Sequence, residues 1–544
     1  FSSAGSAHLI YRAKFDKPFA DVTLGQRGYL RGVAAESREV SNEVTLLSAV
    51  ERLNNNGPWT VPEGIRKSNA QFMLSSGSAR EGWTMSLSAY AARWNATDQV
   101  PQRFIDAGQL PSGQAFGSFD SLDSTDGAKT SRTSLSGTWH KQSEHARTKF
   151  NWYAIQYDFD VFSNFTYLTD PTNSPNGDQF EQKDKRTVLG GWVTQSWLSA
   201  TNASLDMVNT LGVQVRQDQI RLGLYNTASR QVQSTVREDQ VKQSLIGFFG
   251  ENEITWNTWV RSVMGLRADQ FNANVNSYSL SQNSGTTSSA KISPKASVIL
   301  GPWHKTEFFI NAGRGFHSND ARGTTSKLDP KTGAALETAS GLVSSHGQEI
   351  GLKTQAITKL QTTLALWQLD FDSELIYAGD TGSTVAGRPS KRTGIEWSNH
   401  WTPTDHYLLD ANLAWTRPRY SDVSSSGSYI PNAVQKVANF GFAIRSMGPW
   451  SGSWSLRYIG SAPLIEDNSV KSTSSVTSNL RINRKLSSDV DVTLDILNLA
   501  DRKNNDISYY YTSRVAGESL AGVSGLHVHP AEPRTIRISG RMLF

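Results

Sequence analysis

Hydrophobic and polar residues alternate one by one along the last stretch of the chain, 534–544. One parity is mainly apolar and the other mainly polar: Ile536, Ile538, Gly540 and Met542 against Thr535, Arg537, Ser539 and Arg541. A period of two residues is typical of a β-strand with one apolar face, since successive side chains point to opposite faces. The chain ends on an aromatic residue, Phe544, without a polar tail. We therefore expect a strand that runs to the end of the chain.

The same alternation recurs upstream. Apolar residues occupy every second position in 490–496, 454–458 and 367–371. A helix would need them at i, i+3 and i+4, and the Asp, Ser and Thr residues between them are poor helix formers. These segments are predicted to be strands, and the sequence predicts no convincing helix.

The segments between the predicted strands are alternately short and long. The short ones are 78–82, 143–146, 199–203, 256–259, 301–305, 402–406, 446–451 and 486–489. The long ones are 54–68, 96–131, 163–184, 226–237, 272–290, 317–345, 379–391, 420–434, 460–476 and 500–532. Membrane barrels have this organisation, and in lipid only helices and closed barrels satisfy every backbone group. The sequence therefore predicts an all-β fold, a transmembrane antiparallel up-and-down β-barrel of about 22 strands with long extracellular loops and short periplasmic turns.

Several tryptophans lie at the short connections. They are Trp197, Trp256, Trp259, Trp303, Trp401 and Trp450. Amphipathic aromatic rings form girdles where a barrel meets the membrane–water interface. Their positions support the prediction that the short turns lie at one face of a bilayer.

Composition narrows the class of protein. Only 37% of the 544 residues are hydrophobic, and the absence of a run of 18 apolar residues excludes a transmembrane helix but not a barrel. The absence of cysteine excludes disulfides and thiolate metal sites. A net charge of +5 is spread along the chain, without the Lys/Arg clusters that nucleic-acid binding requires, so no nucleic-acid partner is expected.

Four short motifs resemble those of TonB-dependent outer-membrane transporters, also called receptors. Residues 1–11, Phe-Ser-Ser-Ala-Gly-Ser-Ala-His-Leu-Ile-Tyr, are similar to the junction between that family's plug and its first barrel strand. Residues 495–503, Asp-Ile-Leu-Asn-Leu-Ala-Asp-Arg-Lys, resemble the end of its penultimate strand, with Ala500 where an aromatic residue is usual. Residues 313–317, Gly-Arg-Gly-Phe-His, resemble a mid-barrel motif, and 532–535, Glu-Pro-Arg-Thr, resemble the closing segment.

The resemblance implies a division of the chain. Residues 1–14 would be the plug-to-barrel junction with the first strand, and 15–544 the barrel. Family members carry a plug and a TonB-contacting box ahead of the barrel, and neither is found in this sequence. Because Phe1 lies inside a family motif, we expect a plug that belongs to the protein but lies outside this chain. A barrel without a plug is the alternative.

The resemblance also implies a function and partners. The function is active, TonB-dependent uptake of a scarce nutrient, a ferric siderophore or another metal chelate, across the outer membrane of a Gram-negative bacterium. The implied partners are the TonB–ExbB–ExbD complex, outer-membrane lipid and lipopolysaccharide, the small-molecule ligand, and the barrel-assembly machinery during insertion. A passive porin without a plug stays open as an alternative, and so does a soluble all-β binding protein. No hydrolase, zinc-protease or phosphate-loop motif is found, so neither an enzyme nor a cofactor is expected.

Arg314, His317, Asp320 and Arg322 are the first candidates for ligand contact, because they lie where a predicted strand meets the long loop 317–345. A guanidinium fork suits carboxylate, catecholate or phosphate. Contacts to the plug, to other loops or to lipopolysaccharide would explain these residues equally well.

Aromatic and imidazole side chains supply the remaining candidates. Tyr509, Tyr510 and Tyr511 lie in the last long loop, and Trp94 lies beside the second one with Arg93 and Arg103. Exposed aromatic rings can bind a flat or sugar-like ligand, and packing within the loops is the other interpretation. His527 and His529 share one face of an extended segment, so they are a candidate metal site, although two histidines are often ordinary loop residues.

Overall fold

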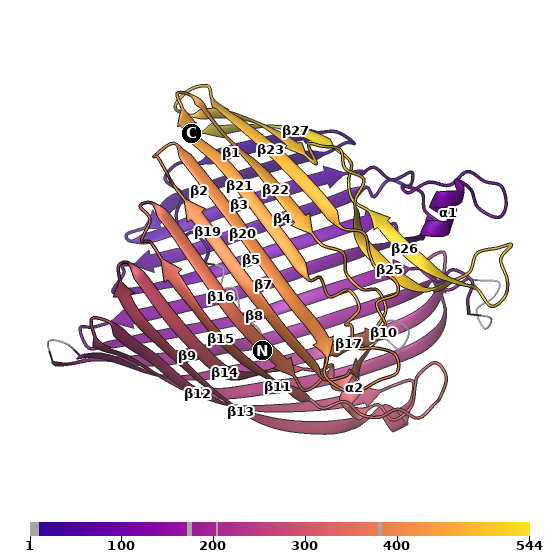
Figure 1. The fold of residues 1–544 in the computed structure, drawn as a ribbon, viewed down its shortest axis with the longest axis horizontal. Helices are drawn as coiled ribbons and strands as arrows, with labels where there is room; N and C mark the ends of the chain where they lie inside the picture. Colours follow the sequence, from indigo (N-terminus) through magenta and orange to yellow (C-terminus); the bar gives the residue numbers. More distant parts are fainter. Residues whose placement is uncertain (1–9, 171–176, 203–204, 379–382) are drawn as a thin grey trace.

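A single closed barrel makes up most of the molecule (Figure 1). The computed structural model describes residues 10–170, 177–202, 205–378 and 383–544. Within these residues, 22 strands form one antiparallel sheet. The sheet closes because the first strand, β1 (Phe19–Gly25), pairs with the last, β27 (Thr535–Leu543). The predicted fold class and number of strands are confirmed.

The other barrel strands follow one another around the wall in chain order. They are β2 (Leu30–Ser41), β3 (Val44–Asn55), β4 (Ile65–Gly77), β5 (Glu81–Asn95), β7 (Gly127–Gln142), β8 (Ala146–Ser163), β9 (Phe180–Asn202), β10 (Leu205–Ala228), β11 (Gln231–Asn257), β12 (Val260–Ser277), β13 (Gly285–Trp303), β14 (Thr306–Ser318), β15 (Leu342–Thr354), β16 (Leu360–Phe371), β19 (Ser390–Trp401), β20 (Tyr407–Tyr420), β21 (Lys436–Met447), β22 (Trp450–Ile459), β23 (Ser475–Lys485) and β24 (Val490–Leu497). Each strand therefore pairs with its chain neighbours, as hairpin connections allow.

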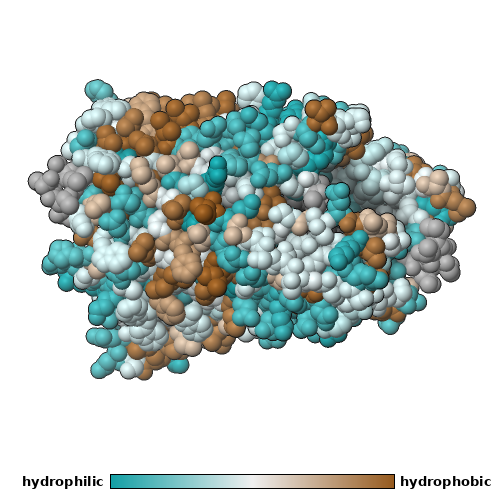
Figure 2. Space-filling view, turned by 90° about the horizontal axis from the view of Figure 1, so that it is seen from below, coloured by the Kyte–Doolittle hydropathy of each residue, from teal (hydrophilic) through white to brown (hydrophobic). Residues whose placement is uncertain are grey.

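The seam between β1 and β27 shows which face is apolar. Leu24 lies opposite Ile538, and the two side chains are 59% and 54% exposed. Residues that lie opposite each other on paired strands point to the same face. The apolar side chains predicted for every second position of 534–544 therefore point out of the barrel. Figure 2 shows that apolar residues gather on the half of the surface toward the short turns, whereas the half toward the long loops is mainly hydrophilic. An exterior of this kind is stable where lipid covers it.

The predicted tryptophan girdle lies at the short turns. The six tryptophans named above are between 41% and 48% exposed, and the rings of Trp259 and Trp303 have centroids 6.0 Å apart. No helix in the described part of the chain is long and apolar enough to span a bilayer.

The prediction of a long loop at 226–237 is wrong. Strands β10 and β11 continue through it and are joined by Ser229 and Arg230 alone, with φ of 48° and 64°. Positive φ at both central residues is typical of a two-residue hairpin turn. These strands have 24 and 27 residues, far more than the roughly 9–11 that cross a bilayer. Their outer ends therefore leave the lipid, and polar residues on both faces resemble a loop in the sequence.

The first strand lies later than predicted. Residues 10–14 are not in a strand, residues 1–9 lie outside the described residues, and β1 begins at Phe19. Ile10 and Tyr11, the described end of the family motif at 1–11, are therefore not part of the barrel wall.

The long loops have structure of their own, at the right of Figure 1. β6 (Val100–Pro101), β25 (Asn505–Ser513) and β26 (Val523–Pro530) form a small sheet beside α1 (Gln102–Ala107). The loop after β14 contains α2 (Ala321–Thr325), the loop after β12 contains the 3-10 turn η1 (Ser281–Asn283), and β17 (Leu375–Ala378) pairs with β18 (Ser383–Ala386). A small core of Val100, Phe104, Phe116, Tyr167 and Val515 holds the first group together.

Candidate ligand-binding site

The inside of the barrel contains a cavity of about 1470 Å³ against the wall from β2 to β10. A row of side chains crosses this wall from strand to strand. Tyr90 lies opposite Arg132, Arg132 opposite Tyr157, and Tyr157 opposite Arg186. Tyr90, Arg132 and Tyr157 line the cavity. Aromatic rings and guanidinium groups therefore alternate over four adjacent strands on the lumen face.

The guanidinium groups of this wall differ in their partners. Arg186 is paired with Asp184, and Arg216 with Asp218 at 3.0 Å. Arg132 donates from Nε to Ser134 Oγ at 3.1 Å and forms no ion pair within the described residues. A guanidinium without a carboxylate partner, between two aromatic rings, is suited to a planar anion.

Trp94 is on the same lumen face and lines the same cavity. The sequence groups it with Arg93 and Arg103, but the structure separates the three. Arg93 precedes Trp94 on β5 and so points to the opposite face. Arg103 belongs to α1, where it pairs with Glu518 at 2.7 Å.

Asp320 and Arg322 line a second lumen cavity of about 440 Å³ together with Arg186 and Arg216. Arg322 Nη2 lies 2.6 Å from Asp320 Oδ2, and the Arg322 side chain is only 7% exposed. Burial favours a higher pKa for Asp320, but the charge and hydrogen bonds of Arg322 outweigh it, so the pKa lies below its ordinary value. This pair contributes a rigid, charged edge to the cavity.

Arg314 and His317 do not join that pair. Arg314 lies opposite His346 and shares the parity of Ile310, which is exposed on the outer face, so it points away from the lumen. His317 packs against Phe371 with ring centroids 5.9 Å apart, and its Nε2 is buried without a hydrogen-bond partner among the described residues. The four candidates from this segment therefore occupy at least two different surfaces.

The three tyrosines of the last loop have different environments. The ring of Tyr511 stacks on His527 and meets Phe165 edge-on with centroids 5.6 Å apart. Tyr510 is partly buried, and Tyr509 is exposed. Packing within the loops explains Tyr511, and Tyr509 is the member of the group that a ligand could reach.

His527 uses both ring nitrogens for hydrogen bonds. Its Nδ1 lies 2.9 Å from the Gly525 carbonyl, which can only accept, and its Nε2 lies 2.7 Å from Ser513 Oγ. The imidazole is fully buried, and burial lowers its pKa to about 4. A metal ion would have to displace one of these bonds.

His529 has a separate set of partners. Its Nδ1 lies 2.7 Å from Asp506 Oδ1, and its ring stacks on Trp59 with centroids 5.1 Å apart. In the part of the chain that the structure describes, no three His, Asp or Glu side chains are placed to hold a metal ion.

The candidates predicted from the sequence do not include Tyr90, Arg132, Tyr157 and Arg186. They lie on four strands, and only the register brings them together. Tyr90 lies on the polar parity of β5 and Arg132 on that of β7, but Tyr157 shares its parity with Ile155 and Phe159, so parity in the sequence does not group the four.

Comparison with known proteins gives a family and a fold. A family model described as "TonB dependent receptor-like, beta-barrel" matches residues 68–499. Among solved structures, the ferric-catecholate import receptor Fiu of E. coli K12, in its closed form, has a TM-score of 0.75 at 13% identity and covers 97% of this chain and 82% of its own. The siderophore receptor PiuA of Acinetobacter baumannii has a TM-score of 0.76 at 12% identity, and the match covers 98% of this chain and 82% of PiuA. The ferric yersiniabactin uptake receptor FyuA of Yersinia pestis has a TM-score of 0.74 at 13% identity, and the match covers 98% of this chain and 80% of FyuA. Comparison with curated protein sequences found no match.

Proposed function

The chain belongs to the TonB-dependent receptors of the Gram-negative outer membrane, and on this basis we propose that it imports a ferric siderophore or another anionic metal chelate. The observation that carries the ligand class is Arg132, a guanidinium without a carboxylate partner among the described residues, which lies opposite Tyr90 and Tyr157 on the lumen wall. A row of aromatic rings and guanidinium groups on one wall complements a flat, negatively charged chelate.

Gating and energy follow the family pattern in this proposal. The ligand is captured at the long-loop end, with Tyr509 and Trp94 as aromatic contacts along its way. A plug domain closes the lumen, and TonB, driven by ExbB and ExbD, moves the plug. Lipid and lipopolysaccharide surround the wall, and the barrel-assembly machinery inserts it. No bond of the ligand is made or broken.

Neither alternative from the sequence is favoured. A soluble all-β protein would not expose so many large apolar side chains on the outside of a closed barrel. The family match favours an energised receptor over a passive channel.

Titration of the full-length protein in detergent with a ferric tris-catecholate complex tests the ligand class, with tryptophan fluorescence as the readout. We expect Arg132→Gln to raise Kd about tenfold, because a charge-assisted hydrogen bond is lost. Lys295→Gln is the matched control, because Lys295 is already neutralised by Glu251 at 2.5 Å and should leave Kd unchanged. Equal binding by the wild type and Arg132→Gln would rule out this site. Uptake of the complex by cells with and without TonB tests the energy source separately.

A further inference from the structure

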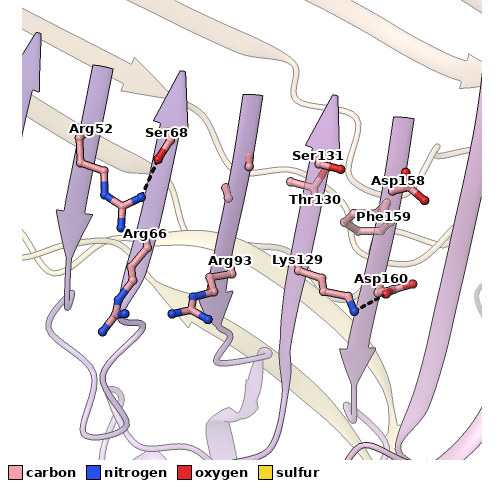
Figure 3. A pocket seen from close by; sticks show the side chains of 12 residues that line it. Arg52, Arg66, Ser68, Arg93, Lys129, Thr130, Ser131, Asp158, Phe159 and Asp160 are labelled. Carbon is pink, nitrogen blue, oxygen red and sulfur yellow. Dashed lines mark hydrogen bonds and ion pairs between the residues drawn. The ribbon is translucent and has the colours of Figure 1, made fainter. Parts of the chain in front are cut away.

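Four basic side chains form a patch on the barrel wall near the long loops (Figure 3). They are Arg52 of β3, Arg66 of β4, Arg93 of β5 and Lys129 of β7, and they line a pocket of about 410 Å³. Arg66 lies opposite Arg93, and Arg93 opposite Lys129. Three cations therefore form one row across adjacent strands, with Arg52 beside them. We call these four residues the outer basic patch.

The patch points away from the lumen. Arg93 has the parity of Met85 and Leu87, which are exposed on the apolar exterior, whereas its neighbour Trp94 lines the lumen cavity. On β4, Arg66 has the parity of the exposed Phe72. The pairings β3–β4, β4–β5 and β5–β7 run without a register shift, so parity assigns the face throughout.

The position of the patch along the barrel axis matches the outer interface of a membrane. Trp83, an outward tryptophan at the short-turn end, is ten residues before Arg93 on β5. Ten residues span roughly 34 Å along a strand, which becomes about 26 Å along the barrel axis at a tilt near 40°. The apolar belt of a membrane barrel is about 25 Å tall. The outward positions between the two, Met85, Leu87, Ala89 and Ala91, carry no charge. Arg93 therefore lies where lipid headgroups begin.

The charges of the patch are only partly neutralised. Lys129 pairs with Asp160 at 2.9 Å, and Arg52 donates to Ser68 Oγ at 2.5 Å. Arg66 and Arg93 form no ion pair within the described residues. Asp158, the other acid at the pocket, lies 3.6 Å from Lys185 of β9. Two guanidinium forks are left for an external anion.

We propose that the outer basic patch binds the headgroup of an outer-leaflet lipid that carries two phosphate groups. Arg binds phosphate through two parallel hydrogen bonds, and the apolar rows below the patch would receive the acyl chains. The patch extends over three strand intervals, about 14 Å, which is wider than a single phosphate. A headgroup with two phosphates would reach both arginines and Lys129 at once.

Native mass spectrometry of the full-length protein in uncharged detergent tests this site. The probes are bisphosphorylated lipid A, monophosphorylated lipid A and inorganic phosphate. We expect retention of bisphosphorylated lipid A, at least tenfold weaker retention of the monophosphorylated form, and no displacement by inorganic phosphate at equal concentration. Arg66→Gln with Arg93→Gln should weaken retention at least tenfold.

Arg221→Gln is the matched control. Arg221 is a cation of β10 that is neutralised by Glu238 at 2.5 Å and should leave lipid retention unchanged. A heat-shifted band in gel electrophoresis verifies that each variant has folded. If the double variant does not fold, the salt dependence of lipid A retention by the wild type tests the proposal instead. Retention should weaken as ionic strength rises, because contacts between arginine and phosphate are screened by salt. Equal retention by wild type and double variant, full displacement by inorganic phosphate, or retention insensitive to salt would each overturn the proposal.

Discussion

The imidazole of His527 lies face to face on the ring of Tyr511, with centroids 3.7 Å apart and planes 13° apart. His527 also bonds to Ser513, to which Arg103 of α1 donates at 3.1 Å. Because Arg103 and Ser513 belong to different loops, the contact joins the loop between β5 and β7 to the loop between β24 and β27. This junction lies among the long loops at one end of the barrel.

Acid should loosen the loop junction. The pKa of His527 is lowered to about 4 by burial, against about 6.5 for a free imidazole. The unfolded loop binds a proton below pH 6.5 and the closed loop only below about 4, so stability falls as pH drops through this window and is lowest below it. The effect is up to about 3 kcal/mol. The protection factors of β25 and β26, which are exchange rates corrected for the intrinsic pH dependence of amide exchange, should fall between pH 6.5 and 4. His527→Gln removes the titration, so the protection factors of that variant should vary much less with pH; an unchanged pH profile would refute the link.

Asp126 should be protonated in the folded loop at neutral pH. Burial, with the nearby charges of Asp98 and Asp123, raises the pKa of Asp126 to about 10. The folded state therefore holds a proton that the unfolded state releases above about pH 4, and this contribution to stability declines as pH rises towards 10. Asp126→Asn mimics the protonated form and should raise loop stability at pH 7.5 by about 1–3 kcal/mol. Thermal unfolding with hydrogen exchange in 96–126 measures this.

Asp123→Asn is the control for that substitution. Asp123 accepts from Thr125 N at 2.9 Å and from Asn164 Nδ2 at 2.9 Å, as a carboxylate does. The amide loses one acceptor oxygen, so this variant should be destabilised. Destabilisation by Asp126→Asn of the same size would show that Asp126 is ionised.

A new charge should cost much more stability at one position of β5 than at the position next to it. Leu87 is exposed on the apolar exterior, and Ser86 lines the lumen cavity. Leu87→Arg would place a charge against acyl chains at a cost of about 2–4 kcal/mol, whereas Ser86→Arg adds a charge to a polar lumen. Unfolding in lipid vesicles by denaturant measures both. Equal losses of stability would contradict the assignment of the two faces.

The sequence predicted the barrel because its evidence is local. The alternation around Ile536 and Ile538 depends on neighbours two residues apart, and lipid enforces it on every strand. The hairpin at Ser229 and Arg230 was not predicted, because it lies beyond the part of the wall where lipid imposes the alternation. Beyond the lipid no apolar face is required, so polar strands and polar loops have the same composition.

The candidate site was predicted less well, because it depends on register. Arg314 and His317 are neighbours in the sequence, yet strand parity directs Arg314 outward and His317 to the other face. Arg132 and Arg186 are far apart in the chain but are connected through Tyr157 on the strand between them. A single sequence does not contain the pairing that sets these neighbours. Asp320 and Arg322 do lie together, because a contact between residues two apart is local; their role in ligand binding stays a prediction.

A buried charge network should control the order of the loop that contains α2. Arg237 and Asp239 are 1% and 0% exposed and form an ion pair, and Arg322 Nη1 lies 3.9 Å from the same carboxylate. Removing one partner of a buried pair leaves an uncompensated charge, so Arg237→Ala should cost about 3–5 kcal/mol. Faster proteolysis within 319–341 and a lower Tm would report the loss. Arg237→Met combined with Asp239→Leu removes both charges at similar volume and should be milder, because Arg322 keeps Asp320. If the double variant unfolds as readily as Arg237→Ala, the pair acts through packing and the charge argument fails.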